Sequence, residues 1–302
     1  MKKRIFKDLR KNWLLWVMFL PVFLYYAIFS YAPMYGILLA FKDYKTKKGI
    51  LGSAWVGFRN FERFFSAYNF ELILKNTIGI SLYSLCVSFP LAIVFALMLN
   101  YLRLPKLKKT VQMVSYAPHF ISNVVVCGML AIFLDSNNGM VNRLLSLLGA
   151  GPVAFLSEPG MFKTIYVLSG VWQGLGWSAI IYISALAGVD YQQHEAAIID
   201  GATKLQRIRH VDIPAIMPTI TMLLILNLGS LMGVGFEKVY LLQNDLNFNA
   251  SDIIATYTYR VGMVNQDYGY STAVGLFNTV INLTLLVTAN TVSRKVNGEG
   301  LW

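Results

Sequence analysis

The chain has 302 residues, of which 56% are hydrophobic and only 14% are charged, and its mean hydropathy is +0.53. Soluble domains carry about 25% charged residues, so this composition excludes an ordinary soluble enzyme and indicates a membrane protein. The net charge of +11 raises nucleic-acid binding as an alternative, but the basic residues mostly flank apolar runs, where they face anionic lipid headgroups. We therefore expect membrane lipids, and no nucleic acid, as partners.

Six stretches contain no Asp, Glu, Lys or Arg and exceed the roughly 20 residues that a helix needs to cross a bilayer. In chain order they are residues 13–41, 76–102, 110–134, 164–189, 213–236 and 268–293. The sequence therefore predicts an all-α, integral membrane protein with six transmembrane helices. The expected organisation is a basic N-terminus at 1–12, a transmembrane domain at 13–293 and a C-terminal tail at 294–302.

Basic residues are denser on one side of this predicted topology. If the N-terminus is cytoplasmic, the inner segments hold 15 Lys and Arg in 51 residues and the outer segments hold 11 in 94; the inner segments are 1–12, 103–109, 190–212 and 294–302. The positive-inside rule then places both termini in the cytoplasm. Since no charged residue lies inside a predicted span, the sequence shows no proton relay, and energy for transport would have to come from a partner.

Between the first two spans, residues 58–68 predict a short amphipathic helix. Its phenylalanines fall along one helical face, and its charged residues fall elsewhere; the phenylalanines are Phe58, Phe61, Phe64 and Phe65. This pattern is typical of a helix that lies on the outer leaflet of a membrane. A docking role for an extracellular protein is the alternative.

Between the fourth and fifth spans, the polar segment 190–214 carries several local signals. Asp190 can cap a helix, and Thr203 with Gln206 three residues later fits a capping box. Gly201 between them permits a positive φ and a sharp turn. Pro214 predicts that the second helix ends just before it, because the residue before a proline avoids the helical conformation.

The same segment resembles the EAA loop found in membrane permease subunits of binding-protein-dependent ABC importers. The matching residues are Glu195-Ala196-Ala197, Asp200-Gly201-Ala202 and Ile213-Pro214, with Pro218 beyond. The resemblance extends to residues 31–36, 235–242, 268–275 and 298–302, which are similar to the oligosaccharide and polysaccharide branch of carbohydrate permeases. Leu205 and Ile208 depart from the aromatic residues that many of these permeases carry there, and both remain apolar.

The resemblance implies the type I permease fold of ABC importers, with cytoplasmic coupling helices that insert into a cleft on the ATPase. Glu195 would be the electrostatic contact, Ala196 and Ala197 would allow close approach, and Gly201 would provide the bend. The full expected set is Glu195, Ala196, Ala197, Asp200, Gly201, Ala202 and Pro214. The implied partners are a second homologous permease subunit, two cytoplasmic ABC ATPase subunits and an extracellular solute-binding lipoprotein.

Motifs for chemistry within the chain itself are missing from the sequence. It contains no GxxxxGK[ST] phosphate loop and no Gly-Lys dipeptide, so we expect ATP and Mg²⁺ to be used by the partner ATPase. Its three histidines lack metal-ligand spacing, and no serine sits in a nucleophile elbow. We therefore expect a transport subunit with no catalytic residue, no metal and no cofactor of its own.

Aromatic and amide side chains in the fourth and fifth spans are candidates for the substrate pathway. Aromatic faces can stack on sugar rings while an amide bonds to hydroxyls. The candidates are Trp172, Gln173, Trp177, Tyr182, Asn227 and Glu237. The competing interpretation is structural, because Trp and Tyr near span ends commonly form interfacial belts, and Gly174 and Gly176 beside them commonly serve helix packing.

These observations predict a multi-pass protein of the bacterial cell membrane that forms half of a translocation pathway for oligosaccharides. Two alternatives remain open on the sequence alone. One is an ABC importer permease for another solute, such as an amino acid, a peptide or glycerol phosphate. The other is a membrane scaffold or channel that needs no ATPase.

Overall fold

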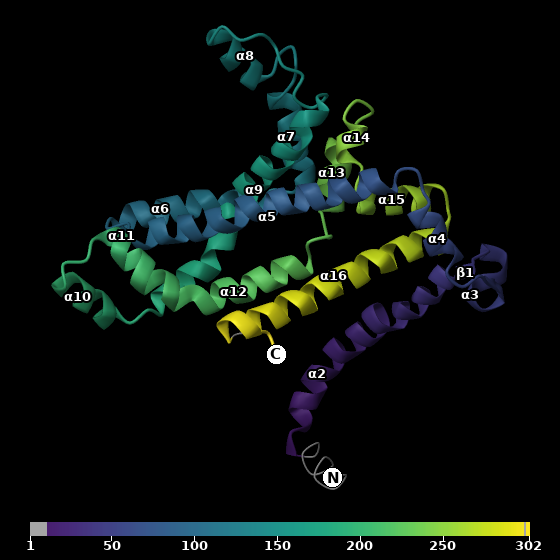
Figure 1. Cartoon of the computed structure of the whole chain (residues 1–302), viewed down its shortest axis with the longest axis horizontal. Helices are drawn as coiled ribbons and strands as arrows, with labels where there is room; N and C mark the ends of the chain where they lie inside the picture. The colour runs from purple at the N-terminus through teal and green to yellow at the C-terminus, as the bar shows by residue number, and fades with distance from the viewer. Residues whose placement is uncertain (1–10, 299) are drawn as a thin grey trace. The chain divides into compact units, whose positions relative to one another are not determined.

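The structure, a computed structural model, describes residues 11–298 and 300–302 and is mostly helical (Figure 1). A two-residue antiparallel pair of strands is formed by β1 (Lys42–Asp43) and β2 (Ala54–Trp55). The main helices are α2 (Trp13–Tyr26), α3 (Gly49–Gly52), α4 (Arg59–Phe65), α5 (Phe70–Asn100), α6 (Pro105–Tyr116), α7 (Asn123–Phe133), α8 (Met140–Leu147), α9 (Pro159–Ala187), α10 (Tyr191–Ile199), α11 (Lys204–Arg207), α12 (Ile213–Gly229), α13 (Phe236–Leu242), α14 (Phe248–Ser251), α15 (Ile254–Tyr259) and α16 (Tyr268–Asn297).

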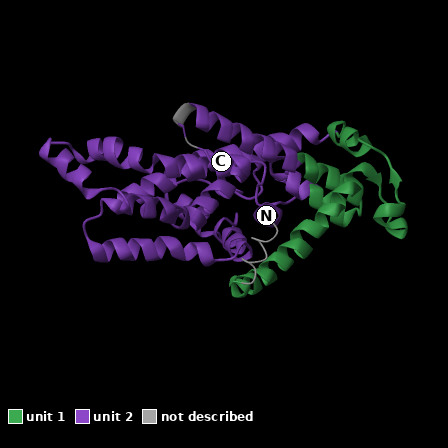
Figure 2. Cartoon of the chain, turned by 90° about the horizontal axis from the view of Figure 1, so that it is seen from below, with its two compact units in different colours: residues 1–67, 258–277 green, residues 68–257, 278–302 purple. Residues whose placement is uncertain are grey.

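The chain forms two compact units (Figure 2). The first comprises Met1–Ala67 with Thr258–Phe277, described from residue 11 onward, and the second comprises Tyr68–Tyr257 with Asn278–Trp302. In the first unit, α2 continues through a π-helical turn and a 3-10 helix to Phe41, which makes one helical run of 29 residues. None of the α2 side chains is buried, although all of them are apolar or aromatic. Such a helix suits lipid or another apolar surface rather than water.

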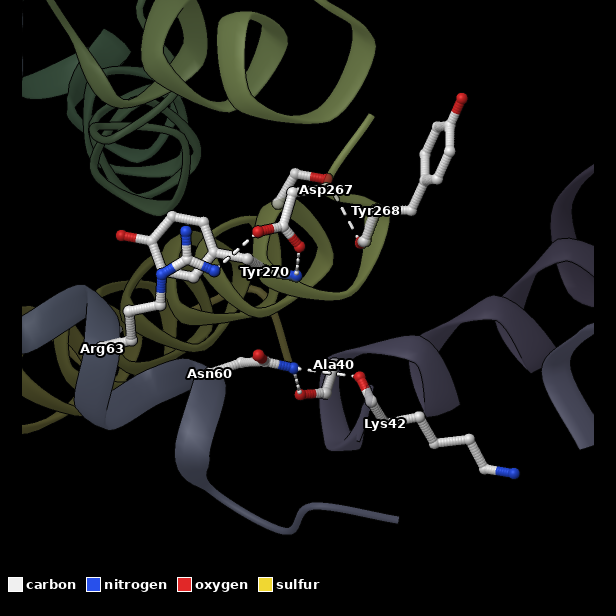
Figure 3. A network of polar contacts seen from close by, with 8 residues as sticks. Ala40, Lys42, Asn60, Arg63, Asp267, Tyr268 and Tyr270 are labelled. Carbon is white, nitrogen blue, oxygen red and sulfur yellow. Dashed lines mark hydrogen bonds and ion pairs between the residues drawn. The ribbon is translucent and has the colours of Figure 1, made fainter. Parts of the chain in front are cut away.

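Polar contacts join α4 to segments far away in the sequence (Figure 3). Asn60 Nδ2 donates to the backbone oxygens of Ala40 at 2.9 Å and Lys42 at 3.2 Å, so α4 is fastened to the end of the first helical run. Arg63 Nη1 lies 2.6 Å from Asp267 Oδ2, which joins α4 to the segment before α16. These bonds hold the first unit together across more than 200 residues of sequence.

The phenylalanines of residues 58–68 divide between the protein interior and its surface. Phe64 is buried and lies edge-on to the rings of Tyr270 and Phe277, whereas Phe58 and Phe65 remain exposed. The predicted helix is confirmed, but the prediction that its whole phenylalanine face lies on a membrane is wrong for Phe64. The sequence pattern shows an apolar face without showing that part of α16 covers it.

The second unit is built around α5 and α9, which pack along each other. One core cluster joins α5, α9 and α12 through mostly small and aliphatic side chains; it comprises Ala92, Ala96, Leu97, Ala179, Tyr182, Leu186 and Ile216. A second cluster joins α5 and α9 to α7 and α13; it comprises Ile80, Cys127, Phe162, Val234, Val239, Leu242 and Ile253. Alanines at the first junction let the helix backbones approach closely, as is common in membrane helix packing.

Gly176 lies where α9 packs tightly against α6. A methyl group at this position would overlap the backbone carbonyl of Ser115 and would lie 2.8 Å from its Oγ. A methyl group on Gly174, two residues earlier on the same helix, would meet no atom within 4 Å. The packing interpretation of these glycines therefore holds for Gly176 and does not hold for Gly174.

Within the described residues, four helical runs are long and apolar enough to cross a membrane, or five if one bent pair is a single span. They are Trp13–Phe41, Phe70–Asn100, Lys204–Gly229 and Tyr268–Lys295, and the bent pair joins Pro105–Phe120 to Asn123–Phe133 at 99°. The fourth predicted span corresponds to α9, a continuous helix of 29 residues. α9 is long enough, but its glycines, serines and Gln173 lower its hydropathy, so its status as the sixth span stays a prediction.

Candidate functional site

The polar segment 190–214 folds as two short helices around a glycine. α10 begins after Asp190, whose carboxylate accepts a hydrogen bond from the backbone N–H of Gln192 at 2.9 Å. α11 begins after Thr203, which forms the expected capping box with Gln206. Gly201 has a φ of +77°, in the left-handed region that favours glycine. The two caps and the glycine turn predicted from the sequence are thus confirmed.

The second helix does not end before Pro214, so that prediction is wrong. Helical backbone continues from α11 through a π-helical turn at Ile208–Asp212 into α12, and Ile213 keeps right-handed helical backbone angles. Pro214 stands in the first turn of α12. A proline in the first turn of a helix interrupts no intrahelical hydrogen bond. The wider π-helical turn before it accommodates the change in backbone hydrogen bonding between α11 and α12.

A buried carboxylate joins the polar segment to the helices beneath it. Asp212 is fully buried; its Oδ2 accepts a hydrogen bond from the Tyr101 hydroxyl at 2.6 Å, and its Oδ1 lies 3.2 Å from His194 Nε2. The guanidinium of Arg207 lies 5.7 Å from the centre of the Tyr101 ring. The network therefore connects α10, the π-helical turn and the end of α5. The sequence analysis did not predict this network. The signal that could have indicated it is Asp212 itself, an acidic residue directly before a long apolar run.

The residues expected to contact an ATPase lie mainly on the surface of this loop. Ala197 and Ala202 are partly buried, and the other five, Glu195, Ala196, Asp200, Gly201 and Pro214, are exposed. Three large apolar residues of the same loop, Ile198, Ile199 and Leu205, are also exposed. Exposed apolar residues next to a charged residue form the kind of surface that a soluble partner can cover.

Three adjoining cavities lie among the helices of the second unit. The largest has a volume of about 600 Å³, the middle one about 230 Å³ and the third about 460 Å³. The largest and middle cavities share Ser84, Ser88, Tyr166 and Ser178 as lining residues. The middle and third share Gly170, Gln173 and Gly174. Because neighbouring cavities share lining residues, the three cavities adjoin one another along α9, and we refer to them together as the chain of cavities.

Five of the six side chains expected in the pathway line this chain of cavities. Trp177, Tyr182 and Asn227 line the largest, Gln173 lines the middle and third, and Glu237 lines the third. Trp172 lines none of the three and is 48% exposed. The structure therefore brings five candidates together and sets Trp172 apart.

Several of these side chains also make structural contacts. Gln173 Nε2 donates to the Ile121 oxygen at 2.8 Å, and Asn227 Nδ2 donates to the Leu223 oxygen at 2.7 Å. The Trp177 ring stacks on His119, with 4.4 Å between ring centres. Each amide keeps its oxygen for other partners. Packing roles and cavity-lining roles therefore coexist on the same residues.

Glu237 and Lys238 differ in their surroundings. Glu237 Oε2 accepts a hydrogen bond from Asn123 Nδ2 at 2.6 Å, whereas Lys238 is 6% exposed and lines the middle cavity. Burial lowers the pKa of Lys238 to about 8. Sequence reasoning singled out Glu237 and missed Lys238, although a lysine set directly before the apolar residues of α13 was a visible signal.

A helical protein with several apolar runs, a folded polar loop and a chain of cavities has the parts of a membrane transport subunit. The chain belongs to the family of binding-protein-dependent transport system inner membrane components, whose family model matches residues 88–298. It is 41% identical to protein LplB of Bacillus subtilis (strain 168) over 97% of this chain and 92% of that protein.

Two further relatives cover nearly the whole chain. The polygalacturonan/rhamnogalacturonan transport system permease protein YteP of B. subtilis (strain 168) is 40% identical over 100% of this chain and 94% of that protein. A chain in the crystal structure of a bacterial alginate ABC transporter, in complex with an alginate pentasaccharide-bound periplasmic protein, matches with a TM-score of 0.91. That chain is 38% identical, and the match covers 99% of this chain and 100% of the other. The fold is therefore that of a type I ABC permease.

Proposed function

We propose that this chain is a permease subunit of an ATP-driven oligosaccharide importer in a bacterial cell membrane. It forms half of the translocation pathway, and a second homologous permease forms the other half. The observation that carries the proposal is the chain of cavities along α9, lined by aromatic and amide side chains, in a member of the binding-protein-dependent permease family. Such walls suit a ligand with apolar ring faces and many hydroxyls.

Fragments of a sugar polymer are the proposed cargo. YteP is named for transport of polygalacturonan and rhamnogalacturonan, and the matched crystal structure is that of an alginate transporter. The high identity over the full length supports the same broad class of cargo here. An extracellular solute-binding lipoprotein would deliver it, as a periplasmic protein accompanies the alginate transporter.

The polar loop is the proposed contact with two cytoplasmic ATPase subunits, which bind ATP and Mg²⁺. Glu195 is exposed beside the apolar surface of Ile198 and Ile199, so one patch offers both charge and apolar area. The buried Asp212 network beneath the loop fixes α10 to the helices around the cavities. Movement of the ATPases would thereby reach the pathway.

The proposal is tested by reconstituting the two permeases, the ATPase and the binding protein in liposomes and measuring oligosaccharide uptake with ATP. Gln173→Ala should weaken uptake by a few-fold to about tenfold, because one lost sugar hydrogen bond costs about 0.5–1.5 kcal/mol. Trp172→Ala is the matched control, since Trp172 lines none of the three cavities, and it should leave uptake unchanged. Assembly and basal ATP hydrolysis should be normal in both.

The same assay decides between the proposal and its alternatives. Absence of ATP-dependent uptake of any oligosaccharide by the assembled complex would refute it, and uptake of an amino acid or peptide instead would change the cargo. Purification of the native protein without an ATPase would favour a scaffold or channel. If Gln173→Ala leaves the concentration dependence of uptake unchanged, Gln173 serves packing through its bond to Ile121 alone.

Orientation gives a separate prediction. Leu205 and Leu246 are exposed to a similar extent, 75% and 68%, and lie in segments expected on opposite sides of the membrane. Single cysteines at these positions, in a background where Cys86 and Cys127 are replaced, should differ in labelling by a membrane-impermeant thiol reagent in intact cells. Only the residue 246 site should react. Reaction at residue 205 alone would place both termini outside.

A further inference from the structure

The middle cavity holds a single charged residue among the described residues that line it, and that residue is Lys238. The largest cavity, which adjoins it, has no acidic or basic residue in its lining. A substrate that moves from one cavity to the other therefore meets one positive charge in otherwise neutral walls. Charges that lie inside a transport protein commonly mark the path of the transported species.

The Lys238 ammonium has no hydrogen-bond or ion-pair partner among the described residues. Its Nζ atom is buried and makes no hydrogen bond there, and it lies 5.4 Å from the centre of the Tyr166 ring. Contact with an aromatic face replaces only part of the hydration that a cation loses on burial. A buried charge without a counter-charge is therefore unfavourable. The amine lies close to the backbone of α9, 3.7 Å from the point that a methyl group on Gly170 would occupy.

The other polar groups of the middle cavity favour a carboxylate as the missing partner. Three serines, Ser84, Ser88 and Ser178, line it with hydroxyl groups that can donate to a carboxylate oxygen. One ammonium balances the single charge of a carboxylate, whereas a phosphate monoester with two charges would be left half unbalanced. The carboxylate of Glu237 in the third cavity repels any anionic group, and it repels a doubly charged phosphate more strongly than a singly charged carboxylate.

We propose that Lys238 binds the carboxylate of an acidic sugar in the translocation pathway, so that the substrates are oligosaccharides containing uronic acids. The inference rests on the proposed function, because it names the class of cargo for the same pathway. Lys238 then acts as the specificity-determining group, and the uncharged lining of the largest cavity lets the sugar leave it again.

The test uses the complete complex in liposomes and two probes with the same sugar backbone, trigalacturonate and its trimethyl ester, in which a methyl group removes the charge of each carboxyl group. Lys238→Gln should lower trigalacturonate uptake at least tenfold at subsaturating concentration and change uptake of the ester less than twofold. Lys238→Arg should retain an intermediate rate. Lys163→Gln is the matched control, because Lys163 also lies on the cavity-forming helix pair but lines none of the three cavities, and it should behave as the wild type.

A chemical-rescue arm compares two adducts of the same assembled variant, so a folding defect of that variant would affect both adducts equally. Lys238→Cys is made with Cys86→Ser and Cys127→Ala, assembled, and then modified with 2-aminoethyl or 2-sulfonatoethyl methanethiosulfonate. The cationic adduct should restore trigalacturonate uptake and the anionic adduct should not. An unreactive cysteine, or equal effects of the two adducts, would overturn the inference.

The outcomes separate the inference from the proposed function. If the wild-type complex takes up a neutral oligosaccharide and not trigalacturonate, or if Lys238→Gln affects the acid and its ester equally, the inference is wrong and the proposed function stands. If the wild-type complex takes up no oligosaccharide of either kind with ATP, the proposed function itself fails.

Discussion

Gly201→Val should abolish most of the coupling between ATP hydrolysis and transport, whereas Gly201→Asn should preserve it. Gly201 has a φ of +77°, and a side chain built there meets no atom within 4 Å. Steric room is therefore equal for the two variants, and only backbone strain differs. A β-branched residue in the left-handed region is a genuine outlier, while asparagine is tolerated there.

The strain of about 1–2 kcal/mol should shift the turn between α10 and α11 and lower substrate-stimulated ATP hydrolysis and uptake by about tenfold. Reconstituted complexes with matched amounts of each variant provide the measurement, and basal ATP hydrolysis and membrane insertion are the controls. Full uptake by the valine variant would show that this turn is not a coupling element. Equal losses in both variants would instead indicate that the glycine is needed for close approach of a partner.

Gly176→Ala should destabilise the packing of α9 on α6, and Gly174→Ala should not. The methyl group at residue 176 meets the backbone carbonyl of Ser115, which cannot rotate away as a side chain would. Overpacking of this kind costs about 1–3 kcal/mol. At residue 174 the methyl group enters open space, and alanine is the better helix former in water, so that variant should be neutral or slightly more stable.

Thermal unfolding of the detergent-solubilised protein measures the difference. The residue 176 variant should melt several degrees lower, and the residue 174 variant should match the wild type. Because Gly174 lines the middle and third cavities, its variant is judged on stability alone. Equal melting temperatures for the two variants would mean that α6 shifts without penalty.

Local signals predicted the local structure well. The caps at Asp190 and Thr203 and the positive φ of Gly201 each depend on a few adjacent residues, and the structure has all of them. Long apolar runs likewise located most of the candidate spans, because hydropathy is a property of the segment itself. The polar composition of α9 is the exception, since a helix that lines cavities need not be uniformly apolar.

Features that depend on distant segments could not be predicted in the same way. Nothing in residues 58–68 shows that Phe64 packs against Tyr270, and nothing near Asp212 identifies Tyr101 as its donor. The candidate pathway residues were found by side-chain type, but only the packing of α9 separates Gln173 from Trp172. Lys238 was missed because its burial results from tertiary contacts.

The uninterrupted helical run Lys204–Gly229 has a mechanical consequence. At 1.5 Å per residue its 26 residues span about 39 Å, from the surface loop to the level of Asn227 at the largest cavity. If a run of that length tilts as one body by about 10° about one end, its other end moves by roughly 7 Å. A small change in the angle at the loop end would therefore move the residues beside the largest cavity by several ångströms.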